Sequence, residues 1–293
     1  MQIISGSNSL KLATKLAKHI NAKLLNYKVA KHPDSELKIQ INDPISGNVI
    51  IVQSTHYPVN DSLMELALLA DAVKRAGAQK IIAVIPYFGY SRQNSINNKN
   101  APLAANFVIK MLELSGITQI ITCDLHSKTL EAMFSIPVKN LPTLNAFIPY
   151  IKPIDNKIII SPDIGSIARC RSYADSLSVD MAIINKYRRE DNQCVMDGII
   201  GDVSGKNCII IDDIVDSAGT LCQAATLLQN NGAKTVQAIV THAVLSGNAL
   251  QKINDSQIEK IYISDSIASV NHPKIQTISI AETLASPLIL LCD

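Results

Sequence analysis

Short apolar runs without polar alternation recur along the whole chain, and amphipathic stretches separate them. Strands whose side chains are apolar on both faces are typical of parallel sheets that helices cover on both sides. Between the runs, the patterns of residues 62–78 and 220–233 predict helices, each with a glycine at its C-terminal end, Gly77 and Gly232. Repeated strand–helix–strand units predict an α/β fold with mainly parallel sheets. The runs that we predict as strands are residues 2–5, 49–54, 80–87, 119–125, 157–162, 180–185, 207–213, 235–242 and 260–264.

The two halves of the chain carry a related pattern. The segment GAQKIIAVIPYFGYS from Gly77 aligns with GAKTVQAIVTHAVLS from Gly232, an offset of about 155 residues. The simplest interpretation is two copies of one α/β unit, joined near residues 143–156, where prolines cluster. The alternative is that any two βαβ units resemble each other. We predict two domains, 1–145 and 146–293, with the last residues packing back on the first domain.

Composition excludes several classes of protein. With 293 residues, 47% hydrophobic and 18% charged, the chain is expected to be globular with a sizeable core. Its net charge of +2 gives no electrostatic reason to expect a nucleic acid or an anionic membrane as partner. The six cysteines include no C-x-x-C pair, which disfavours a zinc site or a disulfide framework. Because no signal peptide or membrane-spanning run is evident either, we expect a soluble cytoplasmic protein.

The stretch IIIDDIVDSAGTL, residues 209–221, combines two acids with a loop of small residues. Asp212 and Asp213 end a predicted buried strand, which is where open α/β sheets bind ligands. The small residues that follow would let backbone N–H groups and a helix N-terminus approach an anion, with hydroxyls from Ser217 and Thr220. A phosphorylated sugar satisfies both features, because its phosphate suits the loop and its hydroxyls suit the acids.

A structural alternative is that Asp216 or Ser217 simply caps the following helix. Capping would explain one residue but not the adjacent acids. The stretch resembles the phosphoribosyl-diphosphate-binding loop shared by type I phosphoribosyltransferases and ribose-phosphate pyrophosphokinases, and by itself it does not distinguish them. The resemblance implies that ribose 5-phosphate is bound by Arg188, Asp212, Asp213, Asp216, Ser217, Ala218, Gly219 and Thr220.

Five further stretches resemble the pyrophosphokinase family, in order along nearly the whole chain. VIPYFGYSRQN (84–94) resembles its ATP-binding segment, and CDLHS (123–127) resembles its metal and ATP site. SPDIGSIAR (161–169) resembles its second metal site, and NKYRRE (185–190) resembles its mobile catalytic loop. NDSLMEL (60–66) also matches the family pattern.

The resemblance implies roles for individual residues. Lys186 and Arg188 would be catalytic, meeting negative charge on the transferred group and the leaving oxygen. His126 and Asp163 would hold Mg²⁺, although His126 is an unusual ligand for so hard an ion. Taken singly, each of these residues has a structural alternative. Lys186 and Arg188 could belong to a solvated charge cluster, His126 could be a structural histidine, and Asp163 could organise a turn. The implied ATP-binding residues are Asp34, Ser35, Glu36, Arg92, Gln93 and His126.

Two departures from the family pattern stand out. The family usually has Phe-x-Asp-Gly-Glu near the start, in a segment that reaches a neighbouring subunit's ATP site, whereas this chain has HPDSE, with His32 and Ser35 at the changed positions. An imidazole stacks on adenine less well than a phenyl ring. Near Ser46 the chain lacks the basic residue of the phosphate-stimulated members, and its tail is shorter. We therefore expect a hyperbolic, weakly regulated enzyme or a small assembly.

The resemblance thus implies two tandem phosphoribosyltransferase-like domains related by approximate two-fold symmetry. The first would keep the fold but lose the sugar-phosphate loop, since QSTHYPVND stands where the acids would be. The implied reaction converts ATP and ribose 5-phosphate into 5-phosphoribosyl 1-diphosphate and AMP, in a homo-oligomer, dimer or hexamer, whose subunits share the ATP site. The alternatives are a phosphoribosyltransferase and a non-catalytic regulatory paralogue.

Overall fold

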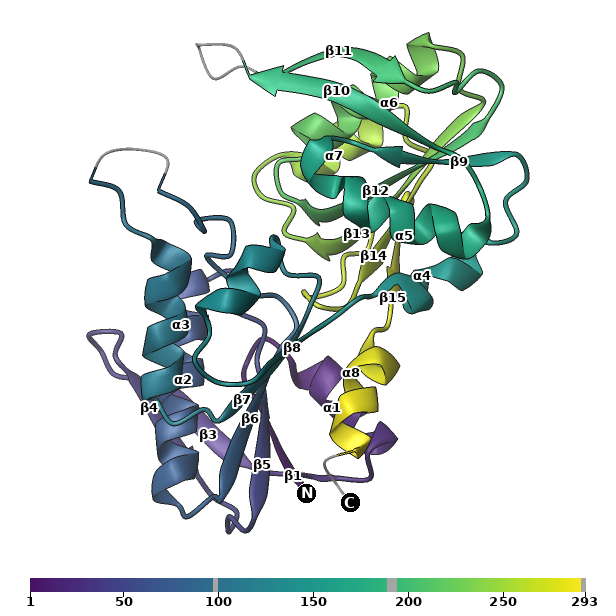
Figure 1. The fold of residues 1–293 in the computed structure, drawn as a ribbon. Helices are drawn as coiled ribbons and strands as arrows, with labels where there is room; N and C mark the ends of the chain where they lie inside the picture. Colours follow the sequence, from purple (N-terminus) through teal and green to yellow (C-terminus); the bar gives the residue numbers. More distant parts are fainter. Residues whose placement is uncertain (97–99, 189–193, 291–293) are drawn as a thin grey trace. The chain divides into compact units, whose positions relative to one another are not determined.

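The computed structural model describes residues 1–96, 100–188 and 194–290, with side chains for all of these except 186–188 and 194–197 (Figure 1). The chain divides into two compact units. Unit 1 comprises Met1–Pro142, Ser266–Ala268 and the C-terminal segment that carries helix α8. Unit 2 comprises Thr143–Asp265 and Ser269–Ile278. Both are α/β structures, as the apolar runs predict.

Unit 1 is built on a parallel sheet with the strand order β2-β1-β5-β6-β7-β8. Helices α2 and α3 cover one face, where their apolar side chains form one core cluster with alternate residues of the strands. Helices α1 and α8 pack together on the other face (Figure 1). The elements of this sheet and its layers are β1 (Gln2–Ser5), α1 (Leu10–His19), β2 (Lys23–Leu24), β5 (Asn48–Val52), α2 (Val59–Arg75), β6 (Lys80–Ile85), α3 (Ala104–Leu114), β7 (Gln119–Cys123), the 3-10 helix η1 (Lys128–Met133), β8 (Val138–Leu141) and α8 (Ala281–Ile289).

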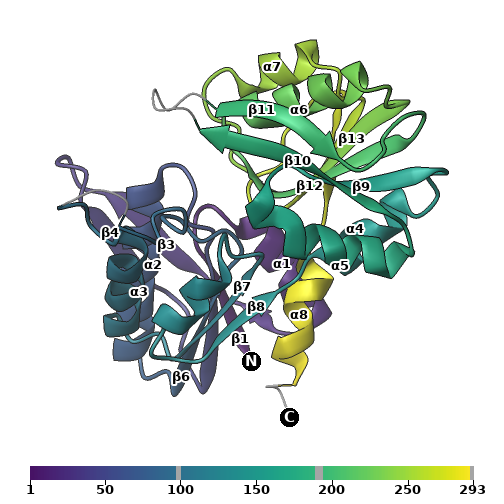
Figure 2. The same ribbon diagram turned by 45° about the horizontal axis from the view of Figure 1, so that its top comes forward.

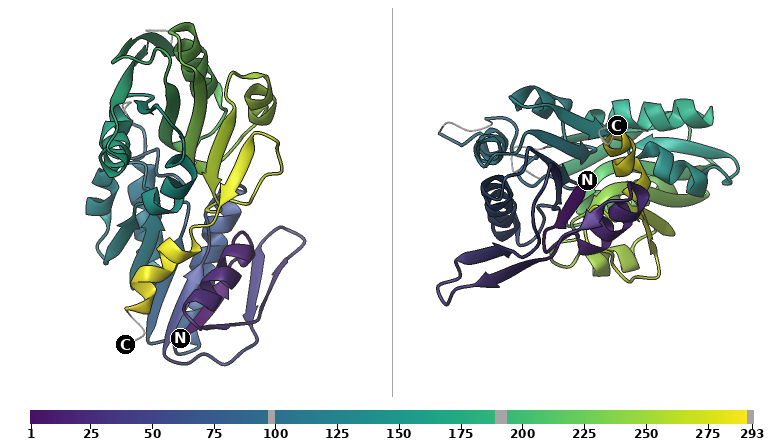
Figure 3. Two further views of the ribbon diagram at one scale, coloured as in Figure 1. Left: turned by 90° about the vertical axis from the view of Figure 1, so that its right-hand side faces the viewer. Right: turned by 90° about the horizontal axis from the view of Figure 1, so that it is seen from below.

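Strands β3 (Tyr27–Lys31) and β4 (Leu37–Ile41) form an antiparallel hairpin in unit 1. It is a separate two-stranded sheet, which Figure 3 shows as an arm projecting from the unit. The segment HPDSE forms its tip.

Unit 2 has the strand order β11-β10-β9-β12-β13-β14-β15, in which only the β10–β11 pair is antiparallel. Helices α4 and α5 lie on one face and α6 and α7 on the other (Figure 2). The elements are α4 (Leu144–Ile151), β9 (Lys157–Ser161), the 3-10 helix η2 (Ile164–Ser166), α5 (Ile167–Leu177), β10 (Met181–Arg188), β11 (Cys194–Ile200), β12 (Asn207–Val215), α6 (Gly219–Asn230), β13 (Thr235–Ala243), α7 (Ala249–Asp255), β14 (Lys260–Ser264) and β15 (Ile275–Ile278).

The two units share one order of elements. β1, β5, β6, β7 and β8 are neighbours in unit 1 in the same order as β9, β12, β13, β14 and β15 in unit 2. Helices α2 and α6 end in the same way: Gly77 and Gly232 have φ of 98° and 83° and donate their N–H groups to Lys74 and Gln229. This is the Schellman geometry that favours glycine. The internal repeat read from the sequence is therefore a repeat of structure.

All nine predicted runs contain strands, and both predicted helices are present. One boundary is wrong: β10 extends to Arg188, so the backbone of Lys186 and Arg188 continues a strand rather than forming a loop. None of the helices in the described part of the chain is both long and apolar enough to cross a bilayer.

Candidate functional site

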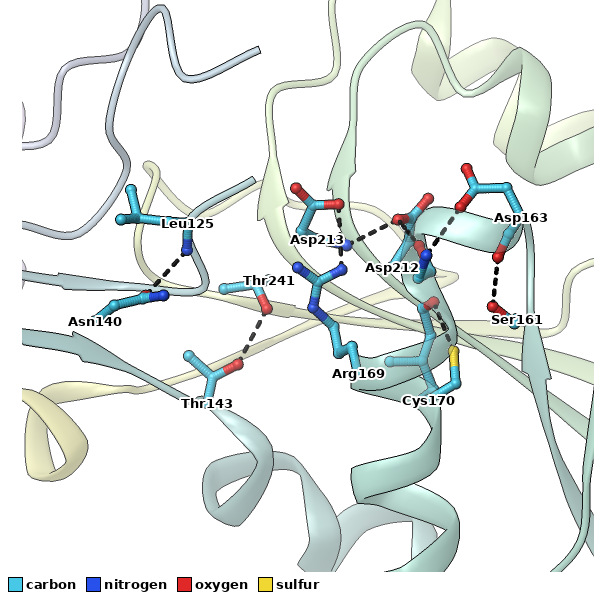
Figure 4. A network of polar contacts seen from close by, with 12 residues as sticks. Leu125, Asn140, Thr143, Ser161, Asp163, Arg169, Cys170, Asp212, Asp213 and Thr241 are labelled. Carbon is cyan, nitrogen blue, oxygen red and sulfur yellow. Dashed lines mark hydrogen bonds and ion pairs between the residues drawn. The ribbon is translucent and has the colours of Figure 1, made fainter. Parts of the chain in front are cut away.

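Two adjacent carboxylates stand near the carboxyl end of β12, the strand between β9 and β13 in the unit 2 sheet. The apolar residues before them, Cys208–Ile211, are fully buried, which fixes the strand in the core. Asp213 is only 5% exposed and forms an ion pair with Arg169 of α5, at 3.3 Å between Oδ1 and Nη1. Asp212 Oδ1 accepts from the Asp213 N–H at 2.9 Å and from Ser166 Oγ at 3.2 Å. Figure 4 shows these groups together.

The electrostatics of Asp212 are those of an overcrowded anionic site. Burial, the neighbouring Asp213 carboxylate and the more distant Asp163 raise the pKa of Asp212 to about 7, and Arg169 opposes this only in part. Three carboxylates therefore face one guanidinium. Ligand hydroxyls that donate hydrogen bonds, or a hard cation, would relieve this excess of negative charge.

Asp163 has a structural role in the turn after β9, which is one of the alternatives that the sequence left open for it. Its Oδ1 accepts from the Ser166 N–H at 3.0 Å and so caps the short helix η2, while Ser161 Oγ donates to the Asp163 carbonyl at 2.7 Å. The same Ser166 bonds Asp212 through its hydroxyl, so one serine links the two carboxylates. Asp163 and Asp212 are thus held in one cluster.

The donor chemistry fits a hard cation such as Mg²⁺. Carboxylate oxygens are its preferred protein ligands, and it commonly takes only one or two of them, with water and substrate phosphates completing the shell. Among the described residues, no group of three or more His, Cys, Asp or Glu side chains is arranged to hold a metal ion. Asp163, which the sequence predicts as a metal ligand, lies in unit 2 beside other carboxylates, and the exposed His126 belongs to unit 1.

The loop between β12 and α6 has the backbone expected of an anion-binding turn. Ala218 is the residue at the N-cap position, and it adopts the left-handed conformation with φ 60°. The residue at the N-cap position is therefore Ala218 rather than Asp216 or Ser217, and its side chain makes no capping hydrogen bond. Instead Asp216 accepts a hydrogen bond from the Ser246 hydroxyl, and Lys252 Nζ donates to the Ser217 carbonyl at 3.2 Å. These contacts fix the loop. The side chain of Ala218 does not cap the N-terminus of helix α6, which follows it.

The corresponding corner of unit 1 carries no such acids. The registers of β5–β6 and β12–β13, with the offset that aligns Gly77 with Gly232, place Gln53 and Ser54 where Asp212 and Asp213 stand in unit 2. Gln53 is fully buried and bonds Glu65 and the Asn8 N–H rather than facing a ligand. The structure thus places an amide and a hydroxyl, Gln53 and Ser54, at the positions of the two acids; that this copy lost a sugar-phosphate site stays a prediction.

The residues expected to bind ATP lie at three exposed places of unit 1. Arg92 and Gln93 follow β6, and His126 follows the adjacent parallel strand β7, so they share the carboxyl edge of the sheet. The hairpin tip holds Ser35 in the left-handed region with φ 76°, and the Glu36 N–H donates to Asp34 Oδ1 at 3.1 Å. Glycine, the usual family residue at this position, would adopt that conformation without steric cost.

Gly89 fixes the path of the segment that leads to Arg92. Its N–H donates to Thr55 Oγ1 at 2.7 Å, and an added Cβ would lie 2.5 Å from the Thr55 carbonyl oxygen. We expect Gly89→Ala to destabilise unit 1 by about 1–3 kcal/mol and to raise the KM for ATP. Urea denaturation and steady-state kinetics test this. Gly198→Ala is the control, because a Cβ there meets nothing within 4 Å. Equal stability of the two variants would contradict the steric argument.

Lys186 and Arg188 are placed only through their backbone. Both belong to β10 and pair with Met196 and Cys194 of β11, after a register shift between Asn185 and Lys186. Their side chains lie outside the described residues.

Sequence reasoning assigned no role to Arg169 and Ser166, although both lie in the segment 161–169 that resembles a metal site. Part of this arrangement could be read from the sequence, because Arg169 follows Ser166 by three residues and side chains at this spacing lie on the same face of a helix. The partner of Arg169 on β12, Asp213, is 44 residues away, so the sequence around Arg169 does not reveal it.

Comparisons with known proteins agree over the whole chain. The family described as the N-terminal domain of ribose phosphate pyrophosphokinase matches residues 1–116, and the phosphoribosyl synthetase-associated domain matches residues 195–289. The chain is 41% identical to a ribose-phosphate pyrophosphokinase of Helicobacter hepaticus, covering 99% of this chain and 96% of that one. It is 40% identical to the enzyme of the same name from Thermosipho africanus, covering 99% and 93%. The crystal structure of phosphoribosylpyrophosphate synthetase from Mycobacterium smegmatis superposes with a TM-score of 0.92 at 28% identity, over 99% of this chain and 98% of that chain.

Proposed function

The chain belongs to the ribose-phosphate pyrophosphokinase family, and we propose that it transfers the diphosphate group of Mg-ATP to the anomeric hydroxyl of ribose 5-phosphate, releasing AMP. The observation that supports the assignment is the Asp212–Asp213 pair followed by the loop 216–220, whose N-cap residue Ala218 is in the left-handed conformation, whereas Gln53 and Ser54 stand at the place of the pair in unit 1. A ligand with hydroxyls at one end and a phosphate at the other matches this order of groups.

Ribose 5-phosphate would bind with its phosphate on the loop Asp216–Thr220, which offers backbone N–H groups and the hydroxyls of Ser217 and Thr220. Its ring hydroxyls would donate to Asp212 and Asp213. Arg169 orients Asp213 through its ion pair and so fixes one side of the sugar pocket. These residues position the sugar; they do not form covalent bonds with it.

The nucleotide would be bound by Arg92, Gln93 and His126 of unit 1 and by the hairpin tip, Asp34–Glu36. We propose accordingly that the first domain serves ATP and the second serves ribose 5-phosphate. Lys186 and Arg188 would stabilise the negative charge that develops on the transferred group and on the departing oxygen of AMP. We also propose that the protein is a homo-oligomer in which a neighbouring subunit's hairpin completes the ATP site.

Magnesium would be held by Asp163 on the sugar side and by His126, directly or through water, on the nucleotide side. It would supply charge neutralisation for the phosphate oxygens. Asp163 is already oriented for this by the Ser166 N–H, which fixes its carboxylate through one oxygen.

One assay tests the function directly. Purified protein with MgATP and ribose 5-phosphate should form AMP and 5-phosphoribosyl 1-diphosphate in equal amounts. A phosphoribosyltransferase would instead release pyrophosphate from 5-phosphoribosyl 1-diphosphate only when a nucleobase is added. A regulatory paralogue would bind ligands without AMP formation, and either of these results would overturn the proposal.

The phosphate dependence of the same assay tests the regulation. Because the chain lacks the basic residue that stimulated members carry near the position of Ser46, inorganic phosphate is expected to change the rate by less than about twofold, with hyperbolic ATP saturation. A strong requirement for phosphate would contradict this expectation.

A further inference from the structure

The hairpin β3–β4 has no ladder of its own with the main sheet of unit 1, as far as the described residues show. Its counterpart in unit 2, the β10–β11 pair, is continuous with its sheet because β10 pairs with β9. A two-stranded hairpin alone is marginally stable in water. The position of the hairpin tip must therefore be set by side chains.

One buried carboxylate lies at the base of the hairpin. Glu65 of α2 is only 5% exposed, and its Oε1 accepts from Tyr27 Oη of β3 at 2.8 Å. The same oxygen accepts from the Ser7 N–H at 3.0 Å and from Ser7 Oγ at 2.7 Å, while Gln53 Nε2 donates to Oε2 at 2.9 Å. Glu65 thus joins the first strand of the hairpin to the loop after β1 and to the end of β5.

The place of Glu65 in the repeated unit explains why a carboxylate can be buried there. The offset that aligns Gly77 with Gly232 aligns Glu65 with Thr220, in the proposed phosphate loop of unit 2. Where unit 2 offers donors to a ligand's anion, unit 1 supplies an anion from its own helix and surrounds it with donors. Tyr27 is one of these donors, so this corner of unit 1 holds the hairpin instead of a ligand.

Other contacts of the hairpin are weaker or less directional. The side chains of Tyr27, Ile39 and Ile41 pack against the core cluster of unit 1, in apolar contacts that are not directional. Lys31 pairs with Asp61 of α2, but both are about half exposed, so solvent screens the pair and it contributes little to stability. A hydrogen bond to a buried carboxylate contributes more than such a pair. Burial and the Glu65 carboxylate also raise the pKa of Tyr27 above its ordinary value, so its hydroxyl stays protonated in alkaline solution as well as at neutral pH.

We propose that Tyr27 and Glu65 are positioning residues that hold the β3–β4 hairpin and thereby set the affinity for the nucleotide that its tip, Asp34–Glu36, contacts. The proposal rests on the proposed function for the nucleotide, but the anchoring itself is a property of unit 1 alone. Neither residue needs to touch a substrate.

The test is Tyr27→Phe, which removes the donor and keeps the ring, with Tyr262→Phe as the matched control in unit 2. Hydrogen exchange of amides 28–41 is expected to rise about tenfold in Tyr27→Phe, since removing about 1.4 kcal/mol changes an opening equilibrium tenfold. The KM for ATP should rise between about 2- and 10-fold, while the KM for ribose 5-phosphate stays within about twofold. Glu65→Gln is the second variant and should shift both quantities in the same direction. Tyr262→Phe should change neither.

The outcomes separate the anchor from the activity. Unchanged exchange of the hairpin in both variants would overturn the anchor, whatever the wild-type protein catalyses. Faster exchange with an unchanged KM for ATP would overturn the link to the nucleotide. If the wild type forms no AMP, the proposed function fails and the exchange measurement still decides whether Glu65 anchors the hairpin. An equal loss for both substrates would indicate general destabilisation and would also overturn the proposal.

Discussion

Replacing Lys186 with alanine is expected to lower the turnover number by about 10²–10³-fold while ribose 5-phosphate binding stays within about twofold of the wild type. The expectation follows from the separation of two tasks. In the proposed function the acids and the loop after β12 bind the sugar phosphate, whereas negative charge on the transferred diphosphate grows only during the reaction. A group that acts only on that growing charge changes turnover without changing ground-state binding.

The strand that carries Lys186 gives this prediction its structural basis. The backbone of Lys186 and Arg188 lies in β10, after a register shift, and their pairing with β11 makes this arm part of the unit 2 sheet. Lys186→Arg should retain part of the turnover, because the charge is kept but a planar fork replaces a compact ammonium.

Measurement requires two experiments on the same samples. Steady-state AMP formation gives the turnover number, and calorimetric titration with ribose 5-phosphate gives its affinity. Lys234→Ala is the matched control, since Lys234 is exposed in the turn before β13, at the opposite edge of the sheet. Turnover close to that of the control would remove Lys186 from the mechanism, and a parallel loss of sugar binding would assign it to ground-state binding.

The sequence predicted the central strands because their signal is local and strong. Runs such as Cys208–Ile211 are apolar on both faces, and both faces are buried. The strands that it missed were β2, β3, β4, β8, β11 and β15. β3 and β4 read YKVAK and LKIQI and are exposed or half-buried at most positions, and β2 has two residues. The prediction selected runs that are apolar on both faces, and it therefore missed strands that are very short or that alternate apolar and polar residues.

The sequence predicted the part of the site whose residues adjoin in the chain. Asp212, Asp213 and the loop 216–220 adjoin in the sequence, so their pattern indicated an anionic sugar ligand. Arg169 and Ser166 reach Asp213 and Asp212 only because α5 and η2 return to β12. Glu65 left a weaker trace, as an acid on the buried face of a helix between Leu63 and Leu66. Its partners come from three other segments, so only the fold identifies it as an anchor.

Replacing Asp212 or Asp213 with asparagine, one at a time, is expected to change the stability of the protein in opposite directions. Asp212→Asn should raise the melting temperature at pH 8. The pKa of Asp212 is about 7 in the folded protein, against an ordinary value of 3.8 for an aspartate in water, so the folded state binds the extra proton between these values. Stability contributed by this group therefore falls as the pH rises from about 4 to about 7 and stays low above that. An asparagine removes the titration and keeps Oδ1 as acceptor for Ser166.

The expected gain for Asp212→Asn is on the order of a few kcal/mol at pH 8 and vanishes near pH 4. Each kcal/mol corresponds to about 2–4 °C for a domain of this size class. Asp213→Asn should instead lower stability by about 1–3 kcal/mol at both pH values, because it removes the carboxylate that forms the ion pair with the largely buried Arg169 guanidinium. Both variants should lose about 10–100-fold in kcat/KM for ribose 5-phosphate, since each removes a charged acceptor from the sugar hydroxyls.

Thermal unfolding in the presence of a chelator, at pH 4.5 and pH 8, separates these effects without substrate or metal. Asp175→Asn, on the exposed side of α5, serves as the control and should shift neither stability nor activity. If Asp212→Asn loses stability at pH 8, the crowding of carboxylates around Asp212 does not govern the stability of the site there. If it gains stability and also keeps full activity, the Asp212 carboxylate is not the acceptor for the sugar, and the pair on β12 would have to bind its ligand through Asp213 alone. If repulsion between the crowded carboxylates destabilises the free protein and ligand binding relieves it, the two variants should change stability in opposite directions, and both should lose kcat/KM.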